Sequence, residues 1–357
     1  MSFPLSSSAL ASLPSPIGWF GSDNQSGAHP AALAAVVDAN EGSAVAYGAD
    51  PWTARAVSAF RDLMGGETTV LFSWNGTGAN VAALATLLPR WGGVLCARGA
   101  HIDVDEGGGP EAFLGAKLIA AVSEDAKLRP DQIDAAMEGA YDPHHVWPQV
   151  VSITQSTELG TLYSVDEVAA ICDTAHRHGL SVHMDGARIA NATAALGVSV
   201  RAHTFGLGVD ALSFGGTKNG MLYGEAILLR NPQHARSGEM IRKQSTQLAS
   251  KMRFISAQFI AILECDRWIE AARHANAMAA RLDAAVRSIP GVFLDRETVV
   301  NSLFPHLPHD AIAPLQQWCP HYTWNAATDQ VRWVTSFNTT TEDVDRFAAG
   351  VAALCQP

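Results

Sequence analysis

The sequence has no cysteine pattern that would serve a disulfide framework, a metal site or a redox centre. Its five cysteines are odd in number and widely scattered, and no two have the spacing of a ligand pair or a redox motif. Thiols distributed in this way are typical of buried structural cysteines in a reducing compartment, so we expect a cytoplasmic protein. The residues are Cys96, Cys172, Cys265, Cys319 and Cys355.

Long apolar runs and an excess of basic charge are also missing. No stretch approaches the roughly 20 residues that cross a bilayer. Residues 1–16 are rich in Ser and Pro and lack the basic start and apolar core of a signal peptide. With 24 Lys and Arg against 35 Asp and Glu, the net charge is -11, which disfavours nucleic acids and anionic membranes as partners.

Apolar runs that alternate with amphipathic segments predict an α/β protein with a mostly parallel sheet. Residues 165–178 have a helical pattern, Gly179 is placed to end that helix, and residues 180–184 follow as a buried strand. Further strands are expected at 211–214 and 226–229. Ligands of such folds gather at the carboxyl ends of the strands.

Two residues with complementary chemistry follow two of these strands. Asp185 ends the first strand in the segment His-Met-Asp-Gly-Ala-Arg, and Lys218 lies in the glycine-flanked turn Ser213–Gly220 after the second. A pyridoxal phosphate enzyme needs such a pair, because the Lys amine holds the cofactor aldehyde as a Schiff base and the Asp carboxylate keeps the pyridine nitrogen protonated. The pair therefore indicates pyridoxal 5'-phosphate (PLP) as the cofactor.

With these motifs the sequence resembles the low-specificity L-threonine aldolases, fold-type I PLP enzymes that are grouped with the β-eliminating lyases. The resemblance runs from about Gly21 to the C-terminus, and several motifs in one order are far more specific than any single motif. The segments that carry it are Ser22-Asp23-Asn24, Tyr47–Pro51, His101 with Glu106-Gly107-Gly108, Ile153–Gln155, Thr157–Thr161, Asp185–Arg188 and Ser213–Gly220.

The resemblance implies a fold, a reaction and an assembly. The fold is the aspartate aminotransferase-like α/β fold, with a mobile N-terminal arm at residues 1–24, a large PLP-binding domain at 25–255 and a smaller α/β domain at 256–357, which suits a chain of 357 residues. The reaction is retro-aldol cleavage of L-threonine, allo-threonine and related β-hydroxy-α-amino acids, with phenylserine as a further candidate, to glycine and an aldehyde. Active sites of this fold are usually completed across a two-fold interface, so we expect a homodimer or homotetramer.

A site for the cofactor phosphate is expected where Asn75-Gly76-Thr77-Gly78 follows the apolar residues 69–72 and precedes the helical residues 81–88. Amides and the dipole at a helix N-terminus favour an anion there. Gly76 lets the backbone approach and Thr77 adds a hydroxyl, although such a segment is more often a plain strand-to-helix turn. By resemblance, His101 stacks on the pyridine ring; the alternative is a loop imidazole bonded to its neighbours.

The substrate carboxylate calls for a planar bidentate cation, which favours Arg over Lys. Arg188 follows Asp185 by three residues, so the same turn can present its guanidinium near the ring. By resemblance, Arg332 is a second carboxylate ligand and Ser22 adds a hydroxyl to the pocket. The alternative for Arg332 is a surface Arg near the start of a strand.

Retro-aldol cleavage also needs a base for the β-hydroxyl proton. His101 is one candidate. The other is His144, which aligns with a loop His of close relatives and has Asp105 as its expected partner. The wider family has a His near the position of Thr157 that is absent here, which shifts weight toward His144, although a loop His is more commonly an exposed polar residue.

The remaining histidines do not indicate a metal site. His176 and His178 are two apart on a predicted helix, where their side chains point to different sides. The pair His144-His145 has no nearby Cys and no HExxH-type helix. We therefore expect no metal.

Three classes of function stay open at this stage. The first is a PLP aldolase, the second is another PLP reaction such as β-elimination or transamination, and the third is a catalytically silent PLP-fold binding protein. The presence of Lys218, Asp185, Arg188 and His101 together argues against the third. The Asp-Gly-Ala-Arg and Thr-Lys-Asn-Gly motifs favour the aldolase over the second.

Overall fold

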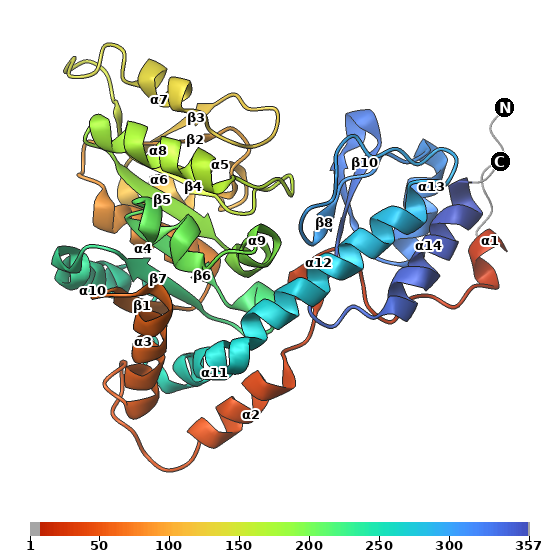
Figure 1. Ribbon diagram of the computed structural model, residues 1–357, viewed down its shortest axis with the longest axis horizontal. Coiled ribbons are helices and arrows are strands. Elements are labelled where there is room, and N and C mark those ends of the chain that lie inside the picture. The colour runs from red at the N-terminus through yellow and green to blue at the C-terminus, as the bar shows by residue number, and fades with distance from the viewer. Residues whose placement is uncertain (1–7, 356–357) are drawn as a thin grey trace. The chain divides into compact units, whose positions relative to one another are not determined.

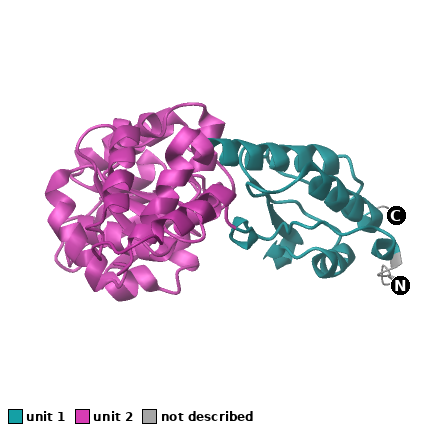
Figure 2. Cartoon of the chain, turned by 90° about the horizontal axis from the view of Figure 1, so that it is seen from below, with its two compact units in different colours: residues 1–27, 269–357 teal, residues 28–268 magenta. Residues whose placement is uncertain are grey.

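The structure is a computed structural model, and it describes residues 8–355 (Figure 1). The chain divides into two compact units: a large unit, Ala28–Trp268, and a small unit made of residues up to Gly27 together with the segment from Ile269 onward (Figure 2). Each unit has its own sheet and its own core.

The unit boundaries differ from those expected from the sequence. The large unit extends to Trp268 instead of 255, because α11 (Arg253–Leu263) packs on α2 and α3 of that unit. The N-terminal segment belongs to the small unit and is not a separate arm, since Leu10 and Phe20 are buried in the small unit's core. The first seven residues of the expected arm lie outside the described residues.

A seven-stranded sheet organises the large unit, in the order β1-β7-β6-β5-β4-β2-β3. The strands from β6 to β3 run parallel, whereas β7 is antiparallel to both of its neighbours. Every residue of β2, β6 and β7 is buried, as expected for strands that are covered on both faces (Figure 1). The mostly parallel sheet predicted from the sequence is thus confirmed. Its strands are β1 (Thr69–Ser73), β2 (Gly93–Ala97), β3 (Lys117–Ala121), β4 (Pro148–Thr154), β5 (Ser181–Gly186), β6 (Ala211–Gly215) and β7 (Glu225–Leu229).

Local sequence chemistry sets the ends of the large-unit helices. In α8, Ser164 and Glu167 form a capping box at the N-terminus, and Gly179, with φ of +72°, follows the C-terminus as predicted. The helices are α2 (Pro30–Ala39), α3 (Pro51–Met64), α4 (Gly76–Leu87), α5 (His101–Val104), α6 (Gly109–Leu114), α7 (Pro130–Ala136), α8 (Val165–Arg177), α9 (Ile189–Leu196), α10 (Ala235–Gln244) and α11.

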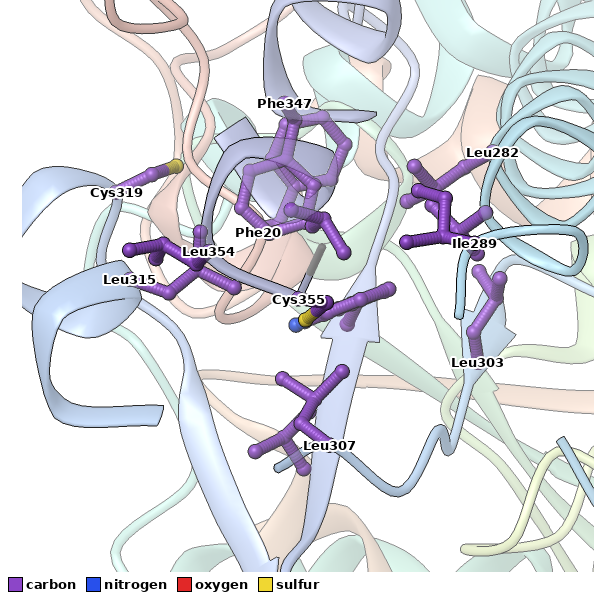
Figure 3. Close-up of a cluster of buried hydrophobic side chains, with 14 of the residues drawn as sticks. Phe20, Leu282, Ile289, Leu303, Leu307, Leu315, Cys319, Phe347, Leu354 and Cys355 are labelled. Carbon is purple, nitrogen blue, oxygen red and sulfur yellow. The ribbon is translucent and has the colours of Figure 1, made fainter. Parts of the chain in front are cut away.

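The small unit holds a three-stranded antiparallel sheet in the order β8-β10-β9. Its core brings the two chain segments together, because the ring of Phe20 stacks on Phe347 at a centroid distance of 4.4 Å (Figure 3). Trp333 meets Phe347 edge-on at a centroid distance of 4.9 Å. No helix among residues 8–355 is long and apolar enough to span a bilayer. The elements are α1 (Ser8–Ala11), α12 (Arg267–Val286), β8 (Ser302–Leu303), α13 (His309–Trp318), β9 (Tyr322–Asn325), β10 (Gln330–Val334) and α14 (Thr341–Cys355).

Candidate active site

The carboxyl ends of neighbouring strands of the large sheet carry the polar residues of the candidate site. Asp185 lies at the end of β5, and β6 leads into the short 3-10 helix η4 (Thr217–Asn219), which contains Lys218. His101 begins α5 after β2. The ends of parallel strands meet at one edge of the sheet, so these three residues come from the edge where α/β proteins bind ligands.

Asp185 is buried, and both of its carboxylate oxygens accept hydrogen bonds from the protein. Oδ1 accepts from the Ala187 amide at 2.9 Å, and Oδ2 accepts from Asn80 Nδ2 at 2.8 Å. The first bond comes from the turn after β5 and the second from α4. The carboxylate is therefore held from two directions, which suits a fixed negative charge opposite a protonated ring nitrogen.

His101 pairs with a buried carboxylate that we had not assigned from the sequence. Its Nδ1 lies 2.9 Å from Glu106 Oε1, and this hydrogen bond is the main cause that raises the pKa of His101 above its ordinary value. The His101 side chain is 36% exposed and that of Glu106 is fully buried. The ligand atoms of His101, Glu106 and Asp185 all lie within 4.8 Å of one another, so the cluster attracts positive charge.

The backbone at His101 is anchored by a second acid, Glu158, a half-buried residue whose Oε2 is shielded from solvent. Glu158 Oε1 accepts hydrogen bonds from the His101 amide at 2.8 Å and from Thr154 Oγ1 at 2.9 Å. Burial raises the pKa of Glu158. Glu158 thus joins the start of α5 to the end of β4.

The turn that carries Lys218 is tightly packed. A Cβ on Gly215 would lie 2.2 Å from the Ala187 carbonyl oxygen, so only glycine lets the end of β6 approach the turn after Asp185. The Gly216 amide donates to Glu225 Oε2 at 2.6 Å, and burial raises the pKa of Glu225 to about 7. Lys218 itself is half-buried.

The start of α4 has the features of an anion site. Asn75 caps the helix, its Oδ1 accepting from the Gly78 amide at 2.8 Å, and the helix begins at Gly76 rather than at 81 as expected. Gly76 and Thr77 are the first two residues of the helix, so their amides have no helical carbonyl to bond. A Cβ on Gly76 would meet nothing within 4 Å, so the space beside Gly76 is open. A phosphate fits this helix start, as Lys218 and Asp185 fit the aldehyde and ring nitrogen of PLP.

The candidate carboxylate ligands lie in different units. Arg188 is half-buried at the N-cap of α9 in the large unit, three residues after Asp185. Arg332, on β10 of the small unit, has its guanidinium carbon 5.4 Å from the ring centroid of Tyr322 and 5.3 Å from that of Trp324.

Ser22 also belongs to the small unit, where its Oγ accepts from the Asn24 amide and caps the short helix η1 (Asp23–Gln25). Arg332 Nη2 lies 3.5 Å from the carbonyl oxygen of Gly21, the residue before Ser22. Arg332 and Ser22 are therefore near each other within their unit. Their contact with substrate stays a prediction.

His144 and Asp105 are both exposed, and no hydrogen bond or ion pair joins them within residues 8–355. The His144 amide donates to Asp142 Oδ1 at 2.9 Å. Asp105 is the C-cap residue of α5. The expected pairing of His144 with Asp105 is absent, and the catalytic role of each stays a prediction.

His176 of α8 and His178, the C-cap residue of that helix, bond to separate acids. His176 Nε2 lies 3.0 Å from Asp210 Oδ2, and His178 Nε2 lies 2.7 Å from Asp134 Oδ1. The two side chains point to different partners, as expected for residues two apart on a helix. The hydrogen bonds to Asp210 and Asp134 account for the orientations of the two imidazoles.

Four polar residues of the site, three of them buried and one half-buried, have no role assigned from the sequence. Glu106 and Glu158 lie in segments that carry the family resemblance, so the sequence indicates that these segments matter for the site. The order of residues does not show which side chain each carboxylate contacts. Asn80 lies in an apolar, buried part of α4, and Glu225 begins an apolar strand. The residues are Asn80, Glu106, Glu158 and Glu225.

Comparison with known proteins supports the resemblance. The family model described as beta-eliminating lyase matches residues 20–307. A low specificity L-threonine aldolase from a Pseudomonas species is 42% identical over 336 residues, which cover 94% of this chain and 97% of that protein. Its counterpart from Pseudomonas aeruginosa is 43% identical over 333 residues, covering 93% of this chain and 96% of that protein. A solved threonine aldolase structure from Leishmania major has a TM-score of 0.89 at 30% identity and covers 94% of this chain and 99% of its own.

Proposed function

The chain belongs to the β-eliminating lyase family, which is PLP-dependent, and we propose that it is an aldehyde-lyase that cleaves L-threonine, allo-threonine and related β-hydroxy-α-amino acids to glycine and an aldehyde. The observation that carries the proposal is the meeting of Asp185, the Lys218 turn and His101 at one edge of the sheet. Identity of 42% and 43% over nearly the whole length of two low specificity L-threonine aldolases supports this reaction over the others that PLP enzymes catalyse.

PLP, when bound, supplies an aldehyde that condenses with amines and a ring that accepts the electrons of the breaking Cα–Cβ bond. Lys218 Nζ is the amine that binds the aldehyde between turnovers. The amides of Gly76 and Thr77, with the Thr77 hydroxyl, bind the phosphate. Asp185, held at both oxygens, keeps a proton at the ring nitrogen.

The substrate is bound through its carboxylate and its β-hydroxyl. Arg188, three residues after Asp185, binds the carboxylate as a bidentate cation. His101 stacks on the ring and lies within reach of the substrate, because its backbone is anchored by Glu158 and its ring by Glu106. The assignments of Arg332 and Ser22 to the substrate carboxylate rest on the resemblance.

Loss of the β-hydroxyl proton drives the cleavage, since the aldehyde forms as that proton departs. His101 is the base that the structure favours, because its ring is hydrogen-bonded to a buried carboxylate that raises its pKa. His144 lies on an exposed loop, between α7 and β4. Loop closure on substrate binding would be needed to bring His144 to the reacting atoms.

Product analysis with the purified, PLP-loaded protein tests the proposal. We expect glycine and acetaldehyde in equal amounts from L-threonine and from L-allo-threonine, and glycine and benzaldehyde from phenylserine. Ammonia and 2-oxobutyrate from threonine would instead indicate β-elimination. Amino-group transfer to an added 2-oxo acid would indicate transamination. If no amino acid is turned over, the remaining hypothesis is a catalytically silent PLP-fold binding protein.

A further inference from the structure

Four side chains of the large unit form a continuous hydrogen-bonded series. His101 Nδ1 lies 2.9 Å from Glu106 Oε1, and Asn80 Nδ2 donates to the same oxygen at 2.8 Å. Asn80 Nδ2 also donates to Asp185 Oδ2 at 2.8 Å. The series joins the helix α4, the segment between α5 and α6, and the end of β5.

Asn80 fits between the two carboxylates in one orientation only. Its amide nitrogen carries two hydrogens, one for each carboxylate, whereas the reversed amide would place its oxygen against two acidic oxygens. Asn80, Glu106 and Asp185 are 2%, 8% and 4% exposed, so water has little access to take over these bonds. Asn80 therefore offsets the repulsion between two buried acids.

Two buried carboxylates call for two positive groups. The protonated ring nitrogen of the cofactor supplies one at Asp185, following the proposed function. The other is His101, whose Nδ1 faces Glu106 and whose ring becomes positive when Nε2 takes up a proton. Glu106 thus has a partner of its own, and Asp185 does not have to serve both the ring and His101.

We propose that Glu106 is the positioning residue for His101, holding its ring with Nδ1–H toward Glu106 and Nε2 as the atom directed to the substrate, and that Asn80 ties this pair to Asp185. Glu106 acts through His101 and does not itself contact the reacting atoms. The inference deepens the proposed function and rests on it for the role of His101. It applies to His101 both as the stacking ring and as the base.

Other charged groups also face His101. Asp185 on β5 raises the pKa of the imidazole, while Lys218 on η4 and burial lower it. Glu158, which follows β4, bonds to the His101 backbone amide and not to the ring. Glu106 is hydrogen-bonded to the ring itself, so its charge can be removed while the contributions of Asp185, Lys218 and burial remain.

The test is a titration of His101 by NMR in the full-length protein carrying imidazole-labelled histidine, with PLP bound and again after its removal. Glu106→Gln keeps the size of the side chain and removes its charge, and we expect it to lower the pKa of His101 by about one unit. The matched control is Glu111→Gln in α6, an exposed acid nearby, for which we expect a shift below about 0.2 units. The signal of His101 is identified by its loss in His101→Gln.

A pKa of His101 that is the same in Glu106→Gln as in the unaltered protein would overturn the proposal. A second measurement needs no variant at Glu106, which matters if Glu106→Gln does not fold. Nitrogen shifts of the unaltered protein above the pKa of His101 should report the proton on Nδ1, and a proton on Nε2 would also overturn the proposal. Neither measurement depends on turnover, so an inactive protein would count against the proposed function without deciding the positioning of His101.

Discussion

Asp185 on β5 and Ser213 on β6 are direct partners in the parallel register, so the two strands end side by side. The turns that follow them pack closely enough that Gly215 cannot carry a Cβ against Ala187. Lys218 lies in the second of these turns. The two residues from which the cofactor was inferred are thus carried by one rigid pair of strand ends.

Replacing Lys218 should remove the covalent link to the cofactor. We expect the purified protein to be yellow and to retain PLP after borohydride reduction and denaturation, and Lys218→Ala to lose that retention, because no other amine is placed by the η4 turn. Lys251→Ala, at an exposed position, is the control and should behave as the unaltered protein. A colourless protein that takes up no PLP would contradict the cofactor assignment.

Neutralising Asp185 should separate cofactor binding from catalysis. Asp185→Asn can still accept one hydrogen bond but cannot hold a proton at the ring nitrogen as an anion does, so we expect PLP to stay bound and kcat to fall by about 10² or more. Asp173→Asn, on the exposed side of α8, should leave kcat unchanged. Near-normal turnover in Asp185→Asn would mean that another residue faces the nitrogen.

The two candidate bases can be distinguished by comparing two reactions. Cleavage of L-threonine requires loss of the β-hydroxyl proton, whereas exchange of the α-proton of glycine does not. If His144 were the base, His144→Ala should lower cleavage by about 10² to 10⁴ and spare exchange. If His101 is both base and stacking ring, His101→Ala should lower both reactions and weaken PLP binding.

The measurement is the ratio of cleavage to exchange in each variant, with His145→Ala as a control on the same loop. The structure leads us to expect an unchanged ratio in His144→Ala, since His144 is exposed and is not bonded to Asp105. A ratio that drops in His144→Ala alone would assign the proton transfer to His144.

The strand ends could be foreseen from sequence, whereas the contacts around them could not. The apolar runs before Asp185 and Lys218 are local patterns that predict two buried strands and the positions of their ends. The link from His101 to Glu106 and from Asn80 to Asp185 depends on how α4 and α5 pack against β5, which no local pattern encodes. For the same reason Asp105, a neighbour of Glu106 in sequence, was expected to be the functional acid of this segment.

Two glycines at the start of α4 should respond differently to a methyl group. A Cβ on Gly78 would lie 2.1 Å from Gln247 Cδ, and Gln247 also accepts a hydrogen bond from the Trp74 amide at 3.0 Å. Gly78→Ala should therefore lower the free energy of unfolding by about 1–3 kcal/mol. Gly76→Ala, with open space at its Cβ, should leave the stability of the cofactor-free protein unchanged but weaken PLP binding.

Thermal denaturation without PLP and a PLP titration measure these two effects separately. Equal melting temperatures for Gly78→Ala and the unaltered protein would show that Gln247 moves aside at little cost. Undiminished PLP affinity in Gly76→Ala would place the phosphate away from the start of α4.

Glu225 should make stability depend on pH. Burial raises its pKa from 4.5 to about 7 in the folded protein, so between these values the folded state holds a proton that the unfolded state has lost. The contribution of this proton to stability is complete below pH 4.5 and disappears as the pH rises through 7. Glu225→Gln lacks this effect, so its stability relative to the unaltered protein should rise between pH 5 and pH 8, by roughly 1–3 kcal/mol.

Melting temperatures across this pH range measure the difference, with the exposed Glu138→Gln as the control. A difference between Glu225→Gln and the unaltered protein that stays constant with pH would show that Glu225 is ionised in the folded state throughout.

The mostly parallel sheet could be predicted from the sequence, whereas the direction of β7 and the boundaries of the two units could not. The mostly parallel sheet follows from alternating strands and helices, but β7 runs antiparallel because residues 216–224 are too few for a helical crossover. The boundary at Trp268 was missed because α11 is an apolar helix whose partners, α2 and α3, lie some 200 residues earlier. Burial of Phe20 depends in the same way on a distant residue, Phe347.

The stacking of Phe20 on Phe347 constrains the order in which the two units can fold during translation. Because a ribosome synthesises residue 20 long before residue 347, the large unit between them can fold while Phe20 still has no core to enter. The core of the small unit can be completed only after α14 has been synthesised, because Phe20 packs on a residue of that helix. During translation the apolar side chains of Leu10 and Phe20 therefore stay exposed until the C-terminal part of the small unit has been made.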